Sequence, residues 1–183
     1  MPIAASLVDL IRERGPITAA AFMDLALYDP RFGYYARAPR RSGRAGDFFT
    51  SVDIGSLFGE LLEIQIAEMF SLLTAGAGAD RGRPFDLVEA GAGDGQLSAD
   101  ILHAARRRDP DLYDRLRLHL VEASAEARAA QRTVLGDDCG RLASSGPDLP
   151  AAFEGVLIAN ELLDAMPVHQ VVKIGRASCR ERV

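Results

Sequence analysis

The sequence has no tryptophan, a single lysine, Lys173, and only two cysteines, Cys139 and Cys179, in 183 residues. The cysteines lack metal-binding spacing and are too few for a disulfide framework, so we expect a reducing compartment and no metal site. No apolar run is long enough to span a membrane, and the N-terminus lacks the features of a signal peptide. These absences predict a cytoplasmic protein without membrane insertion. The abundant arginine and alanine beside one lysine are typical of a GC-rich bacterial gene.

Lysine and arginine together number 21 against 26 aspartates and glutamates, and the formal net charge at pH 7 is -5. We therefore expect no nucleic-acid partner, because neutralising phosphates requires clustered lysine and arginine. The one basic run, Arg106 to Arg108, is better explained as the end of a helix. With 48% apolar and 26% charged residues, the composition is that of a globular domain that buries a core. The composition leaves the oligomeric state open.

The last ten residues, 174–183, have the sequence that results when a common short-read sequencing adapter is translated in frame. Lys173 fits this interpretation, because its codon can end in the first two bases of the adapter. We therefore predict that residues 173–183 are a non-native tail and that the natural coding sequence is cut off near Val172.

Residues 1–73 are predicted to form an N-terminal helical region. Residues 3–14 carry apolar side chains at helical spacing, and Thr18 is placed to cap a second helix through Leu27. A capping-box pattern at Thr50 predicts a longer helix to about residue 73. Its apolar side would comprise Ile54, Leu57, Phe58, Leu61 and Leu62, and its capping partner is Asp53. The glycine- and alanine-rich residues 74–84 are interpreted as a linker.

Residues 85–172 show alternating strand and helix patterns. We predict strands over 85–90, 116–122 and 153–159, and helices over 96–108 and from the capping residue Ser124 to Thr133. Continuous apolar strands separated by helices are typical of a parallel sheet covered by helices on both faces. The predicted fold is α/β, with a doubly wound, mostly parallel and incomplete Rossmann-like sheet and an N-terminal helical appendage.

Three glycines, Gly91, Gly93 and Gly95, alternate between the first predicted strand and its helix. Glycine allows a ligand to approach the backbone closely, and the amides of a helix N-terminus attract anionic groups. Such turns are also rich in glycine for structural reasons alone, so the glycines by themselves indicate little.

The charge around these glycines is more specific. Asp86, Glu89 and Asp94 lie in this region, and no lysine or arginine occurs between Asp86 and Ala105. Each close pair would repel a dinucleotide pyrophosphate by about 1 kcal/mol even at high screening. S-adenosylmethionine instead brings a sulfonium and an ammonium, and its single carboxylate can use the helix amides near Gln96. The pattern therefore favours S-adenosylmethionine, with Glu89 among its binding residues.

Glu122 ends the second predicted strand, where a carboxylate can accept hydrogen bonds from both ribose hydroxyls of a cofactor. It follows Gly95 by 27 residues, more than the roughly 20 of the dinucleotide fingerprint. The alternative for both Glu89 and Glu122 is an ordinary carboxylate at a strand end.

Five motifs in this order resemble the MidA family of class I methyltransferases. They are residues 46–51, 58–61, 89–95, 121–124 with Arg128 and Gln131, and 159–170. The resemblance, from about Leu7 to Val172, implies an S-adenosylmethionine-dependent enzyme. Mitochondrial matrix members of the family dimethylate an arginine of a respiratory complex I subunit and assist its assembly. Members usually have proline and glutamate where this chain has Val52 and Asp53. They also run considerably longer, so we expect this chain alone to be inactive.

The resemblance also points to acceptor residues. Asn160, Glu161 and Asp164 follow the third predicted strand, at the edge of the sheet where ligands bind. A guanidinium pairs bidentately with carboxylates, so these three are the candidate catalytic residues for a protein arginine acceptor. The alternative is that Asn160 and Asp164 only shape a turn.

Asp47 is a further candidate, because its carboxylate could meet the ammonium of the cofactor beside Phe48 and Phe49. A capped helix start explains the same residues equally well. His103 and His119 have no evident partner, and His169 is interpreted as a packed strand residue. We therefore predict an S-adenosylmethionine-dependent protein arginine methyltransferase. The alternatives are a noncatalytic assembly factor and an NAD(P)-dependent oxidoreductase.

Overall fold

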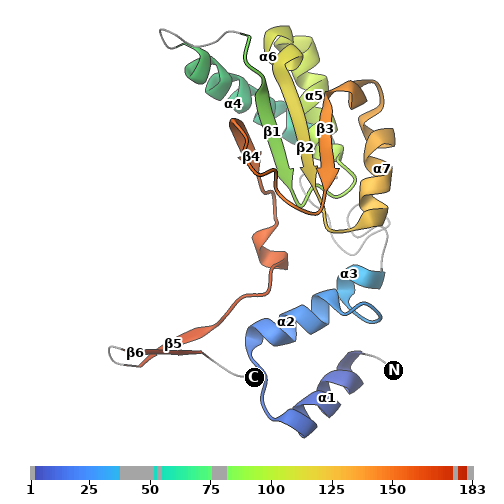
Figure 1. Cartoon of the computed structure of the whole chain (residues 1–183), viewed down its shortest axis with the longest axis vertical. Helices are drawn as coiled ribbons and strands as arrows, with labels where there is room; N and C mark the ends of the chain where they lie inside the picture. The colour runs from blue at the N-terminus through green and yellow to red at the C-terminus, as the bar shows by residue number, and fades with distance from the viewer. Residues whose placement is uncertain (1–2, 38–51, 53–54, 76–81, 175–176, 181–183) are drawn as a thin grey trace. The chain divides into compact units, whose positions relative to one another are not determined.

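The computed structural model describes residues 3–37, 52, 55–75, 82–174 and 177–180. The chain forms two compact units (Figure 1), one of residues 1–39 with 161–183 and one of residues 40–160. Residues 161–172 thus group with the N-terminal helices.

The first unit contains the predicted N-terminal helices and a hairpin. The hydroxyl oxygen of Thr18 accepts the backbone N–H of Ala21 at 3.2 Å, which confirms the predicted cap. The described elements are α1 (Ile3–Arg14), α2 (Ala19–Tyr28), α3 (Tyr34–Arg37), the single 3-10 turn η3 (Leu163–Ala165), β5 (Val171–Ile174) and β6 (Ala177–Arg180). The last two pair antiparallel.

The second unit is built on a parallel sheet with the strand order β3-β2-β1-β4. The strands are β1 (Phe85–Ala90), β2 (Leu116–Val121), β3 (Leu142–Gly146) and β4 (Gly155–Ile158). Leu87, at the centre of β1, lies opposite Leu118 of β2 and Val156 of β4. The predicted α/β fold with a parallel sheet is therefore confirmed, and β3 is an additional edge strand that the sequence patterns did not indicate.

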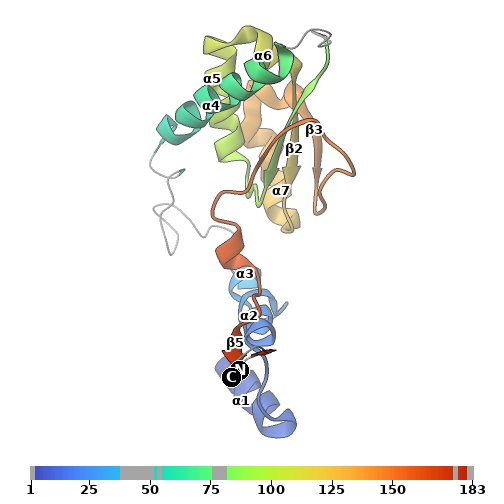
Figure 2. The same ribbon diagram turned by 90° about the vertical axis from the view of Figure 1, so that its left-hand side faces the viewer.

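Helices cover one face of this sheet. Figure 2 shows α4, α5 and α6 together on one side of the strands. Because strand side chains alternate between faces, Phe85 and Leu87 point into the core under these helices, whereas Asp86 and Val88 point to the other face. Among the described residues of this unit, no helix covers the opposite face, so the prediction of helices on both faces is not borne out there. The reason is that the connection from β3 to β4, on the other side of β1, contains no helix. The helices are α4 (Leu57–Thr74), α5 (Gln96–Arg108), α6 (Pro110–Arg115), α7 (Ala125–Leu135) and the 3-10 helix η2 (Gly136–Arg141).

Helix α4 differs from its prediction in both its start and its buried side. It begins at Leu57, and both Thr50 and Asp53 of the predicted capping box lie outside the described residues. Leu57 and Leu61 are 68% and 56% exposed, so the predicted apolar side is wrong for them. The physical reason is Gly59, where a Cβ would lie 2.5 Å from the Cβ of Asp100 in α5. The close approach at Gly59 sets the rotation of the helix.

Candidate functional site

The candidate site lies at the carboxyl edge of the parallel sheet. Residues 91–95 follow β1, Glu122 follows β2 and Asn160 comes two residues after β4. The strand order changes direction between β1 and β4, and in open α/β sheets ligands bind outside the strand ends at such a point. The structure thus brings the glycine loop, Glu122 and Asn160 to one edge, as the sequence predicts.

The three glycines of the loop all have left-handed backbone conformations, with φ of 74° at Gly91, 55° at Gly93 and 87° at Gly95. The loop is pinned to the end of β2, because the carbonyl of Val121 accepts the N–H of Gly91 at 2.9 Å. At Gly95 a Cβ would also lie 3.2 Å from Cδ1 of Leu120. Around Gly93 no heavy atom of the described residues lies within 4 Å of such a Cβ, so this side of the loop is open.

Glu122 is oriented by the loop itself. Its Oε2 accepts the N–H of Gly93 at 2.9 Å, and its Oε1 accepts the N–H of Ser124 at 2.7 Å. A carboxylate has about four acceptor positions, so both oxygens can still accept hydroxyl groups of a ligand. The buried Gln131 holds the same glycine from the other side, donating to the carbonyl of Gly93 at 2.8 Å and accepting the hydroxyl of Ser145 at 2.7 Å. In the sequence Gln131 had no role beyond the family resemblance.

Glu89 lies beneath the loop and is 5% exposed. Burial raises its pKa from the ordinary 4.5 to about 7, although the hydroxyl of Ser98 donates to Oε2 and opposes this shift. Asp94 and Glu122 raise the pKa of Glu89 further, so the neighbouring charges that act on it are both negative. This edge of the sheet therefore presents a negative potential, which suits a ligand that carries positive charge.

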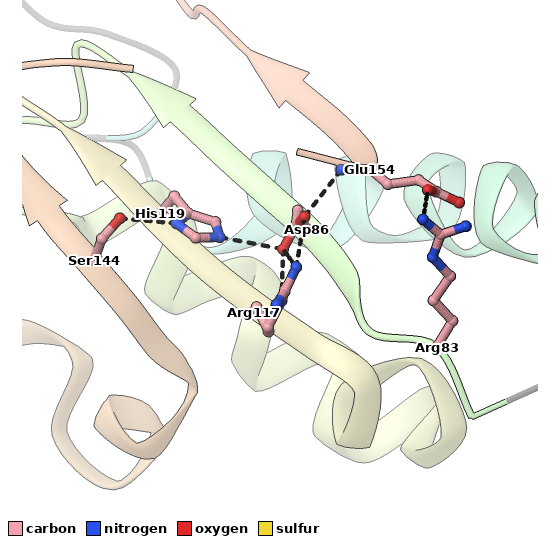
Figure 3. A network of polar contacts seen from close by, with 6 residues as sticks. All are labelled: Arg83, Asp86, Arg117, His119, Ser144 and Glu154. Carbon is pink, nitrogen blue, oxygen red and sulfur yellow. Dashed lines mark hydrogen bonds and ion pairs between the residues drawn. The ribbon is translucent and has the colours of Figure 1, made fainter. Parts of the chain in front are cut away.

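Asp86 does not belong to this site, contrary to the sequence-based interpretation. Asp86 lies about 13 Å along β1 from Ala90, the last residue of the strand, and its side chain is on the face of the sheet opposite to that of Glu89. Its carboxylate accepts hydrogen bonds from Nε of Arg117 at 2.8 Å, from the N–H of Glu154 at 2.9 Å and from His119 Nε2 at 3.1 Å (Figure 3). Burial raises the pKa of Asp86, but these hydrogen bonds outweigh burial and the net pKa is lowered.

His119 therefore has partners, and the expectation that it has none is wrong. Its Nδ1 lies 2.8 Å from the hydroxyl oxygen of Ser144, while Nε2 contacts Asp86. Figure 3 shows this polar network crossing the sheet. His119 lies on β2 two residues beyond Arg117, the residue that pairs with Asp86 of β1. Such a diagonal contact between strands leaves no periodic pattern in the sequence, so the sequence did not indicate this network.

The predicted acceptor residues divide between the two units. Asn160 is half-buried in the unit of residues 40–160, whereas Glu161 and Asp164 are exposed in the other unit. Glu161 has a φ of 49°, a left-handed conformation that is uncommon outside glycine and is enriched at functional positions. Asp47 lies outside the described residues.

Two further features bear on the possible functions. In the described part of the chain, no group of three or more histidine, cysteine, aspartate or glutamate side chains is arranged to hold a metal ion. None of the described helices has the length and apolar character needed to cross a membrane.

Comparisons with known proteins agree with this geometry. A family model described as "Putative S-adenosyl-L-methionine-dependent methyltransferase" matches residues 61–183. A protein arginine methyltransferase NDUFAF7 homolog of Caenorhabditis elegans, described as mitochondrial, is 32% identical over 92% of the chain. Human protein arginine methyltransferase NDUFAF7, also mitochondrial, is 31% identical over 94%.

A crystal structure from Burkholderia thailandensis with S-adenosyl-homocysteine bound superposes with a TM-score of 0.74 and 33% identity. The match covers 98% of this chain and 46% of that one. The chain likewise spans 43% of the C. elegans relative and 42% of the human one, so it corresponds to less than half of these proteins.

Proposed function

The chain belongs to this family of S-adenosyl-L-methionine-dependent methyltransferases, and we propose that the complete protein methylates an arginine side chain of a protein substrate. The names of the relatives support the arginine acceptor. We keep the bacterial cytoplasm as the predicted location, on the basis of the few cysteines.

The observation that carries the cofactor part of the proposal is the carboxylate of Glu122, which the loop amide of Gly93 holds at 2.9 Å. A carboxylate at this place suits neutral ribose hydroxyls as donors, a contact that S-adenosylmethionine and NAD can both make. The nicotinamide-dependent alternative is opposed by the family assignment and by the carboxylates around the glycine loop, which would repel a pyrophosphate. The carboxylate of Glu122, with those of Glu89 and Asp94 close by, fits a cofactor that bears a sulfonium and an ammonium.

In this proposal the protein supplies binding and orientation. Gly91, Gly93 and Gly95 let the cofactor approach the backbone, Glu122 binds the ribose, and Glu89 balances the positive charge of the methionine part. When bound, S-adenosylmethionine supplies an electrophilic methyl group, so no protein nucleophile is required. Asp47 is retained as a proposed partner of the ammonium.

Asn160, Glu161 and Asp164 are the proposed acceptor-binding residues. The two carboxylates would hold the planar guanidinium bidentately and direct one nitrogen at the methyl group. The amide of Asn160, two residues after β4, would orient the same nitrogen. As the nitrogen takes the methyl group from the sulfonium, it would lose a proton to one of these carboxylates, and S-adenosylhomocysteine would be released. Exclusion of water and in-line alignment provide the acceleration.

Calorimetry with S-adenosylmethionine and with NAD on the full-length protein tests the cofactor assignment. We expect binding of the first and none of the second; the reverse result would reject the proposal. Incubation with methyl-labelled cofactor and a cell lysate then tests the acceptor. Cofactor binding without any labelled arginine would favour the noncatalytic assembly factor.

A further inference from the structure

The turn that carries Asp164 is short and has few hydrogen bonds of its own. The 3-10 turn η3 has three residues and is closed by two backbone hydrogen bonds, from Ala165 N–H to Leu162 at 3.1 Å and from Met166 N–H to Leu163 at 3.2 Å. Single turns of this kind have poor hydrogen-bond geometry and little intrinsic stability. The left-handed Glu161 precedes the turn, so the backbone there needs an external contact.

Tyr28 provides such a contact within the same unit. Its hydroxyl donates to the carbonyl oxygen of Ala165 at 2.6 Å, across 137 positions of the sequence. The bond joins the end of α2 directly to the residue after Asp164.

The tyrosine is itself fixed by local structure. Asp29, the next residue, accepts the N–H groups of Arg31 and Phe32 through Oδ1 at 2.9 and 2.8 Å, which turns the chain back. Tyr35 then stacks on Tyr28, with ring centroids 5.2 Å apart and an interplanar angle of 25°. The ring of Tyr28 is thus placed by the turn at Asp29 and by the stack on Tyr35.

We propose that Tyr28 is a positioning residue for the acceptor. Its hydroxyl fixes the η3 turn so that Asp164 and Glu161 present their carboxylates in one geometry to the acceptor guanidinium. The part of the inference that concerns the acceptor rests on the proposed function. The part that concerns the hydrogen bond from Tyr28 to Ala165 does not. Because a guanidinium requires two aligned acceptors, its binding depends on a fixed turn more strongly than that of a compact ammonium.

The test compares Tyr28→Phe, which removes the hydroxyl and keeps the ring stack, with Tyr35→Phe, which removes a hydroxyl from the same stack and leaves the bond to Ala165. The first readout is amide hydrogen exchange at Ala165 and Met166. A net neutral hydrogen bond corresponds to about a fivefold change in an equilibrium, so we expect about fivefold faster exchange in Tyr28→Phe and little change in Tyr35→Phe. Unchanged exchange in Tyr28→Phe would overturn the inference whether or not the protein methylates arginine.

The second readout uses the full-length protein with methyl-labelled cofactor and an acetylated Gly-Arg-Gly peptide amide. We expect the KM for the peptide to rise about fivefold in Tyr28→Phe, with kcat and the affinity for S-adenosylmethionine within twofold of wild type. Partial unfolding would lower kcat and leave KM unchanged, which would contradict a positioning role.

Wild-type protein that binds the cofactor but methylates no arginine would reject the proposed acceptor instead. In that case faster exchange in Tyr28→Phe would still support the part of the inference that concerns the turn.

Discussion

Replacement of Glu89 by glutamine tests whether burial controls the charge beneath the glycine loop. Glutamine keeps the size of the side chain and an oxygen that can accept the hydroxyl of Ser98, but it cannot ionise. In the wild type this carboxyl is 5% exposed and its pKa is raised to about 7. The variant therefore removes one charge and little packing.

The expected effect follows from the two pKa values. Below pH 4.5 the carboxyl is protonated in both the folded and the unfolded chain, and Glu89→Gln should change the free energy of unfolding little. Between pH 4.5 and about 7 the unfolded chain releases the proton while the folded chain retains it, so wild-type stability falls with rising pH. The total loss is about 3 kcal/mol, at about 1.4 kcal/mol per pH unit. Above pH 7 the variant should be more stable than wild type by about this amount.

Urea unfolding without cofactor, at pH values from 4 to 8, measures this difference. Equal unfolding free energies for wild type and Glu89→Gln at pH 8 would refute the argument that burial keeps the carboxyl neutral. Glu63→Gln is the matched control, because Glu63 is also buried with a raised pKa but lies in α4. Both variants should gain stability at high pH. Only Glu89→Gln should also remove the rise in S-adenosylmethionine affinity that we expect between pH 6 and 8, as Glu89 ionises.

Four further substitutions, two of them compared with each other, test the site and its support. Glu122→Gln should weaken S-adenosylmethionine binding about tenfold in calorimetry, since a hydrogen bond to a charged group contributes about 1.5 kcal/mol; unchanged affinity would remove the ribose role. Gly95→Ala should lower the melting temperature more than Gly93→Ala. Both residues have positive φ, but only at Gly95 would the added Cβ lie 3.2 Å from Cδ1 of Leu120, and equal losses would contradict this contact. Asp86→Asn should destabilise the protein by about 1–3 kcal/mol near neutral pH, because it removes the charged acceptor of Arg117, His119 and the N–H of Glu154. The stability from this carboxylate is present above pH 3.8 and lost below it, so acid unfolding curves of Asp86→Asn and wild type should converge at low pH.

The elements predicted correctly from sequence are those with a strong local pattern. Helix α5 runs from Gln96 to Arg108 as predicted, because its apolar residues repeat at helical spacing. Strand β1 is fully buried and lies between Pro84 and Gly91, which mark its two ends in the sequence. Ser124 caps α7, accepting the N–H of Ala127 at 3.3 Å, as its position before the helix indicates.

The elements that were missed lack such a pattern. Strand β3 is an edge strand, and its residues Ala143, Ser144 and Ser145 are exposed, so no apolar run marks it. Helix α6 has only six residues, although Asp109 caps it through the N–H of Leu112 at 3.0 Å. An aspartate followed by proline is a helix-start signal that could have predicted α6.

The two buried carboxylates of β1 show which part of the site the sequence could not predict. Asp86 and Glu89 are three positions apart, so alternation places them on opposite faces of the sheet. Donors from Arg117 and His119 reach Asp86 and lower its pKa, whereas Glu89 meets one hydroxyl and two carboxylates and its pKa is raised. In the sequence, Asp86 and Glu89 are both acidic residues near the glycines, and nothing there distinguishes them. Without Asp86, the negative potential at the loop comes from Glu89, Asp94 and Glu122. These three groups lie at the site itself, and their charge suits a cationic cofactor.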